Sequence, residues 1–472
     1  VTKVHCSTSQ FCNEKDDSGA YKYPDPRTGE PINFNFLPTY ADKGLGVMPH
    51  TVQVYSFSDP SANSYGNENF TYMSQYMNWE AGLGKREVLY YAETAYWVNV
   101  DVDVPTFLPL SGQRRLADLR YTAQQEKIHK FRIDGQVNFE SGHEFGYYLS
   151  NAVTARAVWN PRTEIKEEWA AYGAALAPLL AAFGDFAQPL QDLIVKLAKA
   201  QAEVLVFSRV NGATPSDEDL LKLSGHAYMS GADSWVDLER MLGLSITQPD
   251  KIHLQETSDP NWDKMTALLK ELREVFALSA KNFKDLLTQA TEAGLEQQPL
   301  KFLQELSDCV QLLSARAQHN TLLYKAVHPS TSADERTALL LQGRHLLSET
   351  QTVMDRLVAN FRVPADRISS WRQGPTVYPY GYVWAARTLY YFWRDQGVAE
   401  ARTERAAVSP CYLNRQEPLE LAFGWGKALE QALRVLLEKR GLPKTKIDPE
   451  VVKLMAECLS PPLKEIRLPR DL

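Results

Sequence analysis

The sequence predicts an α/β fold, a partial TIM-type β/α barrel followed by a large all-α region, on three observations. Short apolar runs alternate with helical stretches in the first part of the chain, which is typical of parallel βα units. From Glu164 onward, Leu, Ala, Glu and Lys dominate and apolar residues recur three and four apart, as in helices. Glu140 ends an alternating apolar run just before Ser141-Gly142, where an α/β barrel places its chemistry.

The predicted barrel portion covers residues 1–163. We expect its strands at 2–6, 49–57, 86–92 and 131–139 and its helices at 72–80 and 116–127, the first of them stopped by Gly82 and Gly84. A whole barrel takes about 250 residues, and about four βα units precede the helices. We therefore expect the chain to start within the barrel, with earlier strands removed, lost or supplied by another chain.

The remainder is predicted to be helical. A bundle domain covers 164–365, with helices near 164–183, 186–207, 216–242, 262–291, 298–327 and 332–361. Residues 366–472 form a third zone, an aromatic-rich segment followed by C-terminal helices. The aromatic segment, from Trp371 to Trp393, fits either a sugar-binding platform or core packing, and core packing is the commoner use of such residues.

Composition narrows the classes of function. The net charge of −7 argues against a general nucleic-acid binder, which needs a basic surface. No apolar run reaches the roughly 20 residues that a membrane-spanning helix needs. Five cysteines occur without a C-x-x-C pair, and Cys6 and Cys12 fit either a local disulfide or two thiols.

Two acidic side chains at predicted strand ends carry the functional hypothesis. Glu93 and Glu140 each follow a strand of the same predicted sheet, so both should open on the face that holds active sites. A pair of carboxyl groups suits glycoside hydrolysis, one as general acid and the other as nucleophile or base. We therefore predict Glu140 and Glu93 as catalytic residues.

Other residues near these strand ends are candidates for substrate binding. Aromatic rings offer flat walls on which sugars stack, and carboxylates and a histidine can bond hydroxyl groups; the candidates are Tyr91, Tyr96, Trp97, Asp101, Asp103, His143 and Tyr147. Asp101 and Asp103 could instead cap a loop, and His143 could be structural. The pair His143-Glu144 lacks the second histidine of a zincin helix, so we predict no metal and no cofactor.

The same region resembles a largely uncharacterised group of glycoside-hydrolase-like proteins. The resemblance covers roughly residues 1–175 and is carried by four segments, Gly135–Glu140, Tyr147–Ala152, Ala157–Pro161 and Glu168–Gly173. It implies the end of a TIM barrel followed by an α-helical region, and a carbohydrate ligand. The early stretch from Cys6 to Cys12 and the run ending at Val54–Phe57 fit the same pattern loosely.

Together these observations predict a secreted or periplasmic glycoside-hydrolase-like protein that hydrolyses or binds glycans. The alternative is a non-catalytic carbohydrate-binding or assembly protein on a barrel scaffold, because a fold does not prove an activity. The separation of the Glu93 and Glu140 carboxyls would distinguish them. About 5–10 Å across an open cleft favours hydrolysis, whereas burial in separate ion pairs favours the alternative.

Overall fold

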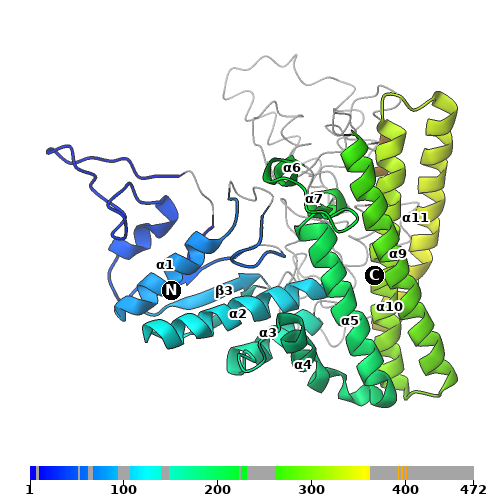
Figure 1. Cartoon of the computed structure of the whole chain (residues 1–472), viewed down its shortest axis with the longest axis horizontal. Coiled ribbons are helices and arrows are strands. Elements are labelled where there is room, and N and C mark those ends of the chain that lie inside the picture. Colours follow the sequence, from blue (N-terminus) through cyan, green and yellow to red (C-terminus); the bar gives the residue numbers. More distant parts are fainter. Residues whose placement is uncertain are drawn as a thin grey trace, which may run out of the picture.

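A computed structural model defines the fold. It describes residues 1–6, 10–51, 54–61, 67–93, 107–139, 148–222, 225–230 and 262–361, together with 392, 395–396 and 399–400. The short strands lie at one end of the described molecule and three long helices at the other, with α5 between them (Figure 1).

The strands pair in parallel. β1 (Thr2–Val4) pairs with β2 (Val47–Pro49), and β3 (Leu89–Glu93) pairs with β4 (Gly135–Phe139). Two single parallel bridges, Val47 to Val88 and His50 to Tyr91, connect β2 with β3. The parallel pairing expected from the βα alternation is therefore confirmed, and the carboxyl ends of these strands open toward the same side.

The predicted TIM-type barrel is wrong. Within the described residues the strands form two sheets of two strands each, every strand is three to five residues long, and no barrel closes. After β4 the described chain continues into helix after helix instead of further strands. The expectation that another chain completes the barrel rested on that prediction and loses its basis.

The predicted strand at 49–57 is also wrong, because β2 ends at Pro49, His50 adds a single bridge, and the described residues from Val54 onward form turns and irregular chain. Buried side chains bind the backbone there in place of a neighbouring strand. The Ser56 N–H donates to Asp59 Oδ2, and the Phe57 N–H donates to Asp118 Oδ1, each at 2.9 Å. Once these groups are satisfied by side chains, the alternating pattern cannot form a ladder.

Helices connect the successive strands. The 3-10 helix η1 (Phe34–Tyr40) lies between β1 and β2, α1 (Thr71–Leu83) between β2 and β3, and α2 (Pro109–His129) between β3 and β4. Gly84 caps α1 with φ 58°, so the predicted glycine stop is confirmed. α2 starts at proline, which costs no hydrogen bond in a first turn, and runs longer than the predicted 116–127.

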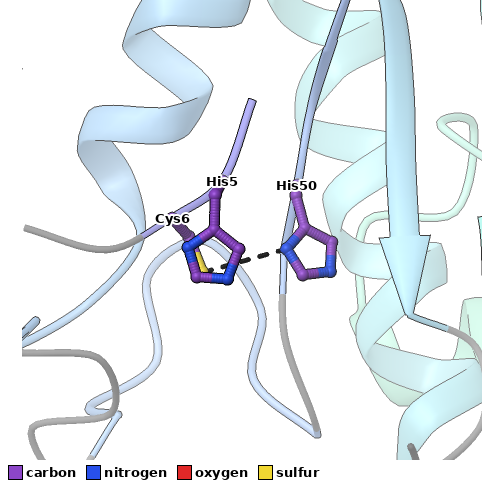
Figure 2. Close-up of side chains that lie close together, drawn as sticks. All are labelled: His5, Cys6 and His50. Carbon is purple, nitrogen blue, oxygen red and sulfur yellow. Dashed lines mark hydrogen bonds between the residues drawn. The ribbon is translucent and has the colours of Figure 1, made fainter. Parts of the chain in front are cut away.

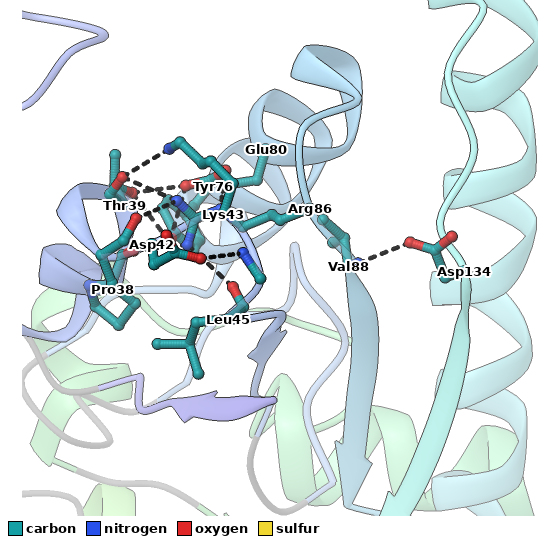
Figure 3. A network of polar contacts seen from close by, with 12 residues as sticks. Pro38, Thr39, Asp42, Lys43, Leu45, Tyr76, Glu80, Arg86, Val88 and Asp134 are labelled. Carbon is teal, nitrogen blue, oxygen red and sulfur yellow. Dashed lines mark hydrogen bonds and ion pairs between the residues drawn. The ribbon is translucent and has the colours of Figure 1, made fainter.

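A buried ion pair fixes the amino end of β3 (Figure 3). Arg86 Nε lies 3.2 Å from Glu80 Oε2, and both side chains are fully buried. The same guanidinium donates to the carbonyls of Pro38, Thr39, Ala41 and Leu45. The chain between η1 and β2 is thereby tied to α1, which holds the strands from the end opposite to Glu93.

The rest of the described chain is helical. α3 (Tyr148–Trp159), α4 (Glu168–Leu180), the 3-10 helix η3 (Ala181–Phe186), α5 (Ala187–Gln201) and the π-helical turn η4 (Ala202–Val206) come first. Two short helices follow, α6 (Asp217–Lys222) and α7 (Gly225–Ser230), and then α9 (Trp262–Glu292), α10 (Gln297–Val327) and α11 (Ala333–Phe361). The three long helices match their predicted bounds within a residue or two.

Packing in the long helices follows the apolar spacing. α9 buries a stripe that recurs three and four residues apart, which includes Leu268, Leu269, Leu272 and Phe276, and it packs against α10. α10 packs against α11 on another side and buries residues over most of its length. Full burial of each Leu or Phe contributes about 1.5–3 kcal/mol.

The two parts of the chain meet at the start of α2. Gln201, at the end of α5, accepts from the Leu110 N–H at 3.2 Å and donates to the Phe107 carbonyl at 2.7 Å. The Tyr172 hydroxyl of α4 donates to the Pro109 carbonyl at 2.8 Å. All of these side chains are buried. The domain boundaries predicted near 163 and 365 stay predictions.

One described segment, Glu168–Val206, is long and apolar enough to cross a membrane by length and composition alone. It comprises α4, η3, α5 and η4, and its helical geometry breaks at Gly184, where φ is 54° and ψ is −126°. Its helices pack on α2 and α9 through buried faces. In its most apolar 18-residue stretch, 39% is buried.

Candidate functional site

The strand ends bring together a cluster of histidine, cysteine and glutamate side chains. His5 and Cys6 follow β1, His50 follows β2, and Glu93 is the last residue of β3. One side-chain donor atom from each of His5, Cys6 and His50 lies within 4.8 Å of the other two. Figure 2 shows the His5 ring and the Cys6 sulfur side by side on one segment, facing His50 on the neighbouring one. We call His5, Cys6, His50 and Glu93 the strand-end cluster.

Backbone hydrogen bonds set the position of these residues. The His50 N–H donates to the Val4 carbonyl at 3.1 Å, which extends the β1–β2 pairing and places His50 beside His5 and Cys6. The Cys6 carbonyl accepts from Asn67 Nδ2 at 2.7 Å and from the Tyr72 hydroxyl. Both sides of the cluster are therefore held by the fold.

The two ring nitrogens of His50 face different side chains. Its Nδ1 lies 3.9 Å from Cys6 Sγ, and its Nε2 lies 3.3 Å from Glu93 Oε1. The three side chains are nearly inaccessible, with exposed fractions of 0% for Cys6, 2% for His50 and 6% for Glu93. His5 is only partly buried, and its ring centroid lies 5.7 Å from that of His50.

Burial controls the charge of both imidazoles. It lowers the pKa of His5 to about 4, helped by His50 and Lys3 and opposed by Glu93. Burial also lowers the pKa of His50, although the hydrogen bond and charge of Glu93 act in the opposite direction. Both rings are therefore neutral at pH 7, and a neutral imidazole keeps one nitrogen lone pair for a ligand.

A second set of buried polar groups lies beneath the cluster. Arg115 of α2 donates from Nη1 to Thr51 Oγ1 at 2.5 Å and from Nη2 to the Tyr55 carbonyl. The Tyr90 hydroxyl lies 3.0 Å from Thr51 Oγ1 and donates to Asp118 Oδ2 at 2.7 Å. Because Thr51 follows His50, these contacts hold the chain at the end of β2.

Two of the predicted site residues lie in the described part of the chain. Glu93 belongs to the cluster, so its predicted place at a parallel strand end is confirmed, while its catalytic role stays a prediction. Tyr91 is half-buried; its ring lies 5.2 Å from His50 and under Lys3 Nζ at 5.4 Å. The other predicted residues fall outside the described residues: Tyr96, Trp97, Asp101, Asp103, Glu140, His143 and Tyr147.

Sequence analysis missed His5, Cys6 and His50 as site residues. No spacing motif connects them, because His50 lies 44 residues after Cys6. In the structure His5 and Cys6 come just after β1 and His50 just after β2. The predicted strands 2–6 and 49–57 included all three residues, so the rule that site residues follow strand ends did not single them out. The alternative of a Cys6–Cys12 disulfide does not hold, because Cys12 is a buried thiol outside any disulfide.

The arrangement has two chemical uses. A thiol, an imidazole and a carboxylate in series resemble a nucleophile, its base and the group that orients the base. Three converging nitrogen and sulfur donors instead suit a soft or borderline cation. Full burial of the Cys6 side chain disfavours attack on a substrate, because reactive cysteines are partly exposed.

Comparison with known proteins gives limited information. No protein-family model and no curated protein matches the chain. Among solved structures, a GH138 enzyme targeting pectin rhamnogalacturonan II is similar, with a TM-score of 0.42 and 10% sequence identity. The similarity covers 79% of this chain and 54% of that one, so the chain spans about half of that enzyme's length. The chain is thus distantly similar in structure to a glycoside hydrolase, at a level too low to define its own fold or activity.

Proposed function

We propose that this protein acts on glycans as a hydrolase, with Glu93 and Glu140 as its pair of carboxyl groups. One observation carries the proposal: Glu93 is a buried carboxyl at the carboxyl end of β3, in register with Phe139, the last residue of the parallel neighbour β4. Glu140 is the next residue in the sequence. Thus one acidic residue ends β3, and the other comes directly after the parallel neighbour β4 in the sequence.

This pairing suits the chemistry of glycosidic bonds. One carboxyl protonates the leaving oxygen while the other attacks the sugar or activates water. Glu93 is almost excluded from solvent and lies 3.3 Å from His50 Nε2, so its carboxyl has a fixed orientation. A fixed, weakly solvated carboxyl is what proton transfer to a substrate oxygen requires.

The test compares the acidic residues at the carboxyl ends of β3 and β4 with one that precedes β3. The purified protein is incubated with a panel of neutral and acidic polysaccharides, and released reducing ends are measured. Glu93→Gln and Glu140→Gln should each lower turnover at least about 100-fold, since a general acid or base contributes that much or more. Glu87→Gln, at an exposed residue that precedes β3, is the control and should keep full turnover.

Folding is checked by circular dichroism and by the urea midpoint of each variant. If glycan turnover persists in both Glu93→Gln and Glu140→Gln, the assignment of these carboxyls is wrong. If the folded wild-type protein turns over no glycan in the panel, the hydrolase proposal gives way to the second candidate.

The second candidate is glycan binding without turnover. The burial of Glu93 against His50 favours it, because a carboxyl engaged by a neighbouring side chain is less available to a substrate. Binding without turnover predicts that a glycan shifts the thermal midpoint of the wild-type protein while no reducing ends appear. Titration calorimetry with the same panel measures that binding directly.

A further inference from the structure

The strand-end cluster carries an inference that does not depend on glycan turnover. We propose that His5, Cys6 and His50 bind a zinc ion, or a divalent ion of similar chemistry, with Glu93 orienting His50 from behind. The donors come from the segments that follow β1 and β2, and the orienting carboxyl comes from β3. Such an ion would join three successive strands at their carboxyl ends.

The distances fit a tetrahedral ion. Bond lengths of about 2.3 Å to sulfur and 2.0–2.1 Å to nitrogen place the sulfur and a nitrogen about 3.5 Å apart. Cys6 Sγ and His50 Nδ1 are 3.9 Å apart, and the full set of three donor atoms lies within 4.8 Å.

The second contact of His50 supports the same assignment. A histidine that binds a metal through one ring nitrogen usually donates the other N–H to a carboxylate or a carbonyl. His50 has Nδ1 toward Cys6 and Nε2 toward Glu93 Oε1 at 3.3 Å. In this orientation Nδ1 faces the Cys6 sulfur, and Nε2 faces the carboxylate that would orient the ring. The contact between His50 and Glu93 is a separate observation from the proximity of His5, Cys6 and His50.

Charge and donor type select the ion. Two nitrogens and one sulfur suit zinc rather than calcium or magnesium, which bind oxygen. Lys3 and Arg115 place positive charge near His50, and the Glu93 carboxylate acts in the opposite direction. Because the Cys6 side chain is fully buried, the ion would stabilise the strand ends rather than expose a reactive thiol.

The first experiment measures metal stoichiometry. The full chain is stripped with a chelator, loaded with Zn²⁺, desalted and analysed by elemental mass spectrometry. We expect about one zinc per chain in the wild-type protein, and loss of that zinc in Cys6→Ser and His50→Gln. Cys12→Ser, which changes a buried thiol outside the cluster, should retain it. Glu93→Gln should bind zinc about 10–100-fold more weakly.

A second measurement needs no variant. X-ray absorption of the zinc-loaded wild-type protein should show one sulfur at about 2.3 Å and the remaining nitrogen or oxygen ligands near 2.0–2.1 Å. A shell without sulfur, a shell with several sulfurs, or equal zinc in wild type and Cys6→Ser would overturn the proposal. Failure of glycan turnover leaves these readouts unchanged, so the two proposals can fail separately.

Discussion

Among the described residues, buried histidines occur in two regions, the strand ends and helix α10, and their neighbours differ. At the strand ends His50 lies between the Cys6 thiol and the Glu93 carboxyl. In α10, His319 Nε2 lies 3.0 Å from Gln396 Oε1, and the Phe392 ring stacks on the imidazole at 5.3 Å. Burial alone does not separate a ligand from a core residue, whereas the chemistry of the neighbours does.

Arg316 is a further neighbour of His319. It lies one turn from His319 on α10, pairs with Asp395 and stands over the Phe392 ring at 5.4 Å. Its guanidinium places a positive charge beside His319, as Lys3 and Arg115 do beside His50. The difference lies in the donor atoms: within the described residues, three donors are grouped at His5, Cys6 and His50. The α10 group (Arg316, His319, Phe392, Asp395 and Gln396) is therefore organised to fix packing, and the strand-end cluster to hold a ligand.

The largest expected effect comes from breaking the α10 group. Asp395→Ala leaves the Arg316 charge buried, and loss of one partner of a buried pair costs about 3–5 kcal/mol of the free energy of unfolding. Urea unfolding measures this loss. The control is Arg344→Ala, which breaks the more exposed pair with Glu400 and should cost about 0–1 kcal/mol. Equal losses in the two variants would show that the α10 pair is not a packing element.

The next effect is a dependence of stability on pH. Burial, followed by the Arg316 charge, lowers the pKa of His319 to about 4. The unfolded value is about 6.5, so the folded state is fully favoured above that pH and loses stability as the pH falls toward 4. The shift corresponds to about 3 kcal/mol at the acid limit. His5 and His50 shift in the same direction and add to this slope.

Urea unfolding at pH 7, 5.5 and 4 measures the slope. His319→Gln should flatten it, because the glutamine amide does not titrate, and His129→Gln, at the exposed end of α2, should leave it unchanged. An identical slope in wild type and His319→Gln would remove His319 from the pH response.

The smallest of the three effects separates the regions by ligand. A zinc concentration of about 100 times the dissociation constant should raise the free energy of unfolding by about 2.7 kcal/mol. His319→Gln should show the same gain, because the α10 group takes no part in binding. Cys6→Ser should show none. A gain that depends on His319 and not on Cys6 would reverse the roles of the two regions.

Helix periodicity predicted the long helices well. The bounds 262–291, 298–327 and 332–361 lie within two residues of α9, α10 and α11, because apolar positions at three and four extend over many turns. The strands were harder to predict. In the described part of the alternating run at 49–57, the strand ends at Pro49, and the N–H groups of Ser56 and Phe57 donate to Asp59 and Asp118. Such tertiary partners leave no local signal.

The candidate site was predicted in part for a related reason. Glu93 follows an apolar run and was identified from that position. His5, Cys6 and His50 come just after β1 and β2 in the structure, but the predicted strands extended over them. No motif connects residues so far apart, and the partner strands were not known from the sequence. The barrel was overestimated because parallel βα units also occur in arrays that do not close.

The strand-end cluster takes its residues from three successive strands, and this sets the order in which they are synthesised. His5 and Cys6 leave the ribosome first, His50 follows after more than forty residues, and Glu93 after a similar interval. Arg115, which holds Thr51 beside His50, is made later still. The three proposed donors are thus complete once His50 is made, whereas Glu93 and Arg115, which contact His50 and Thr51, follow later. An ion held by the donors alone would precede the groups that bury and orient them.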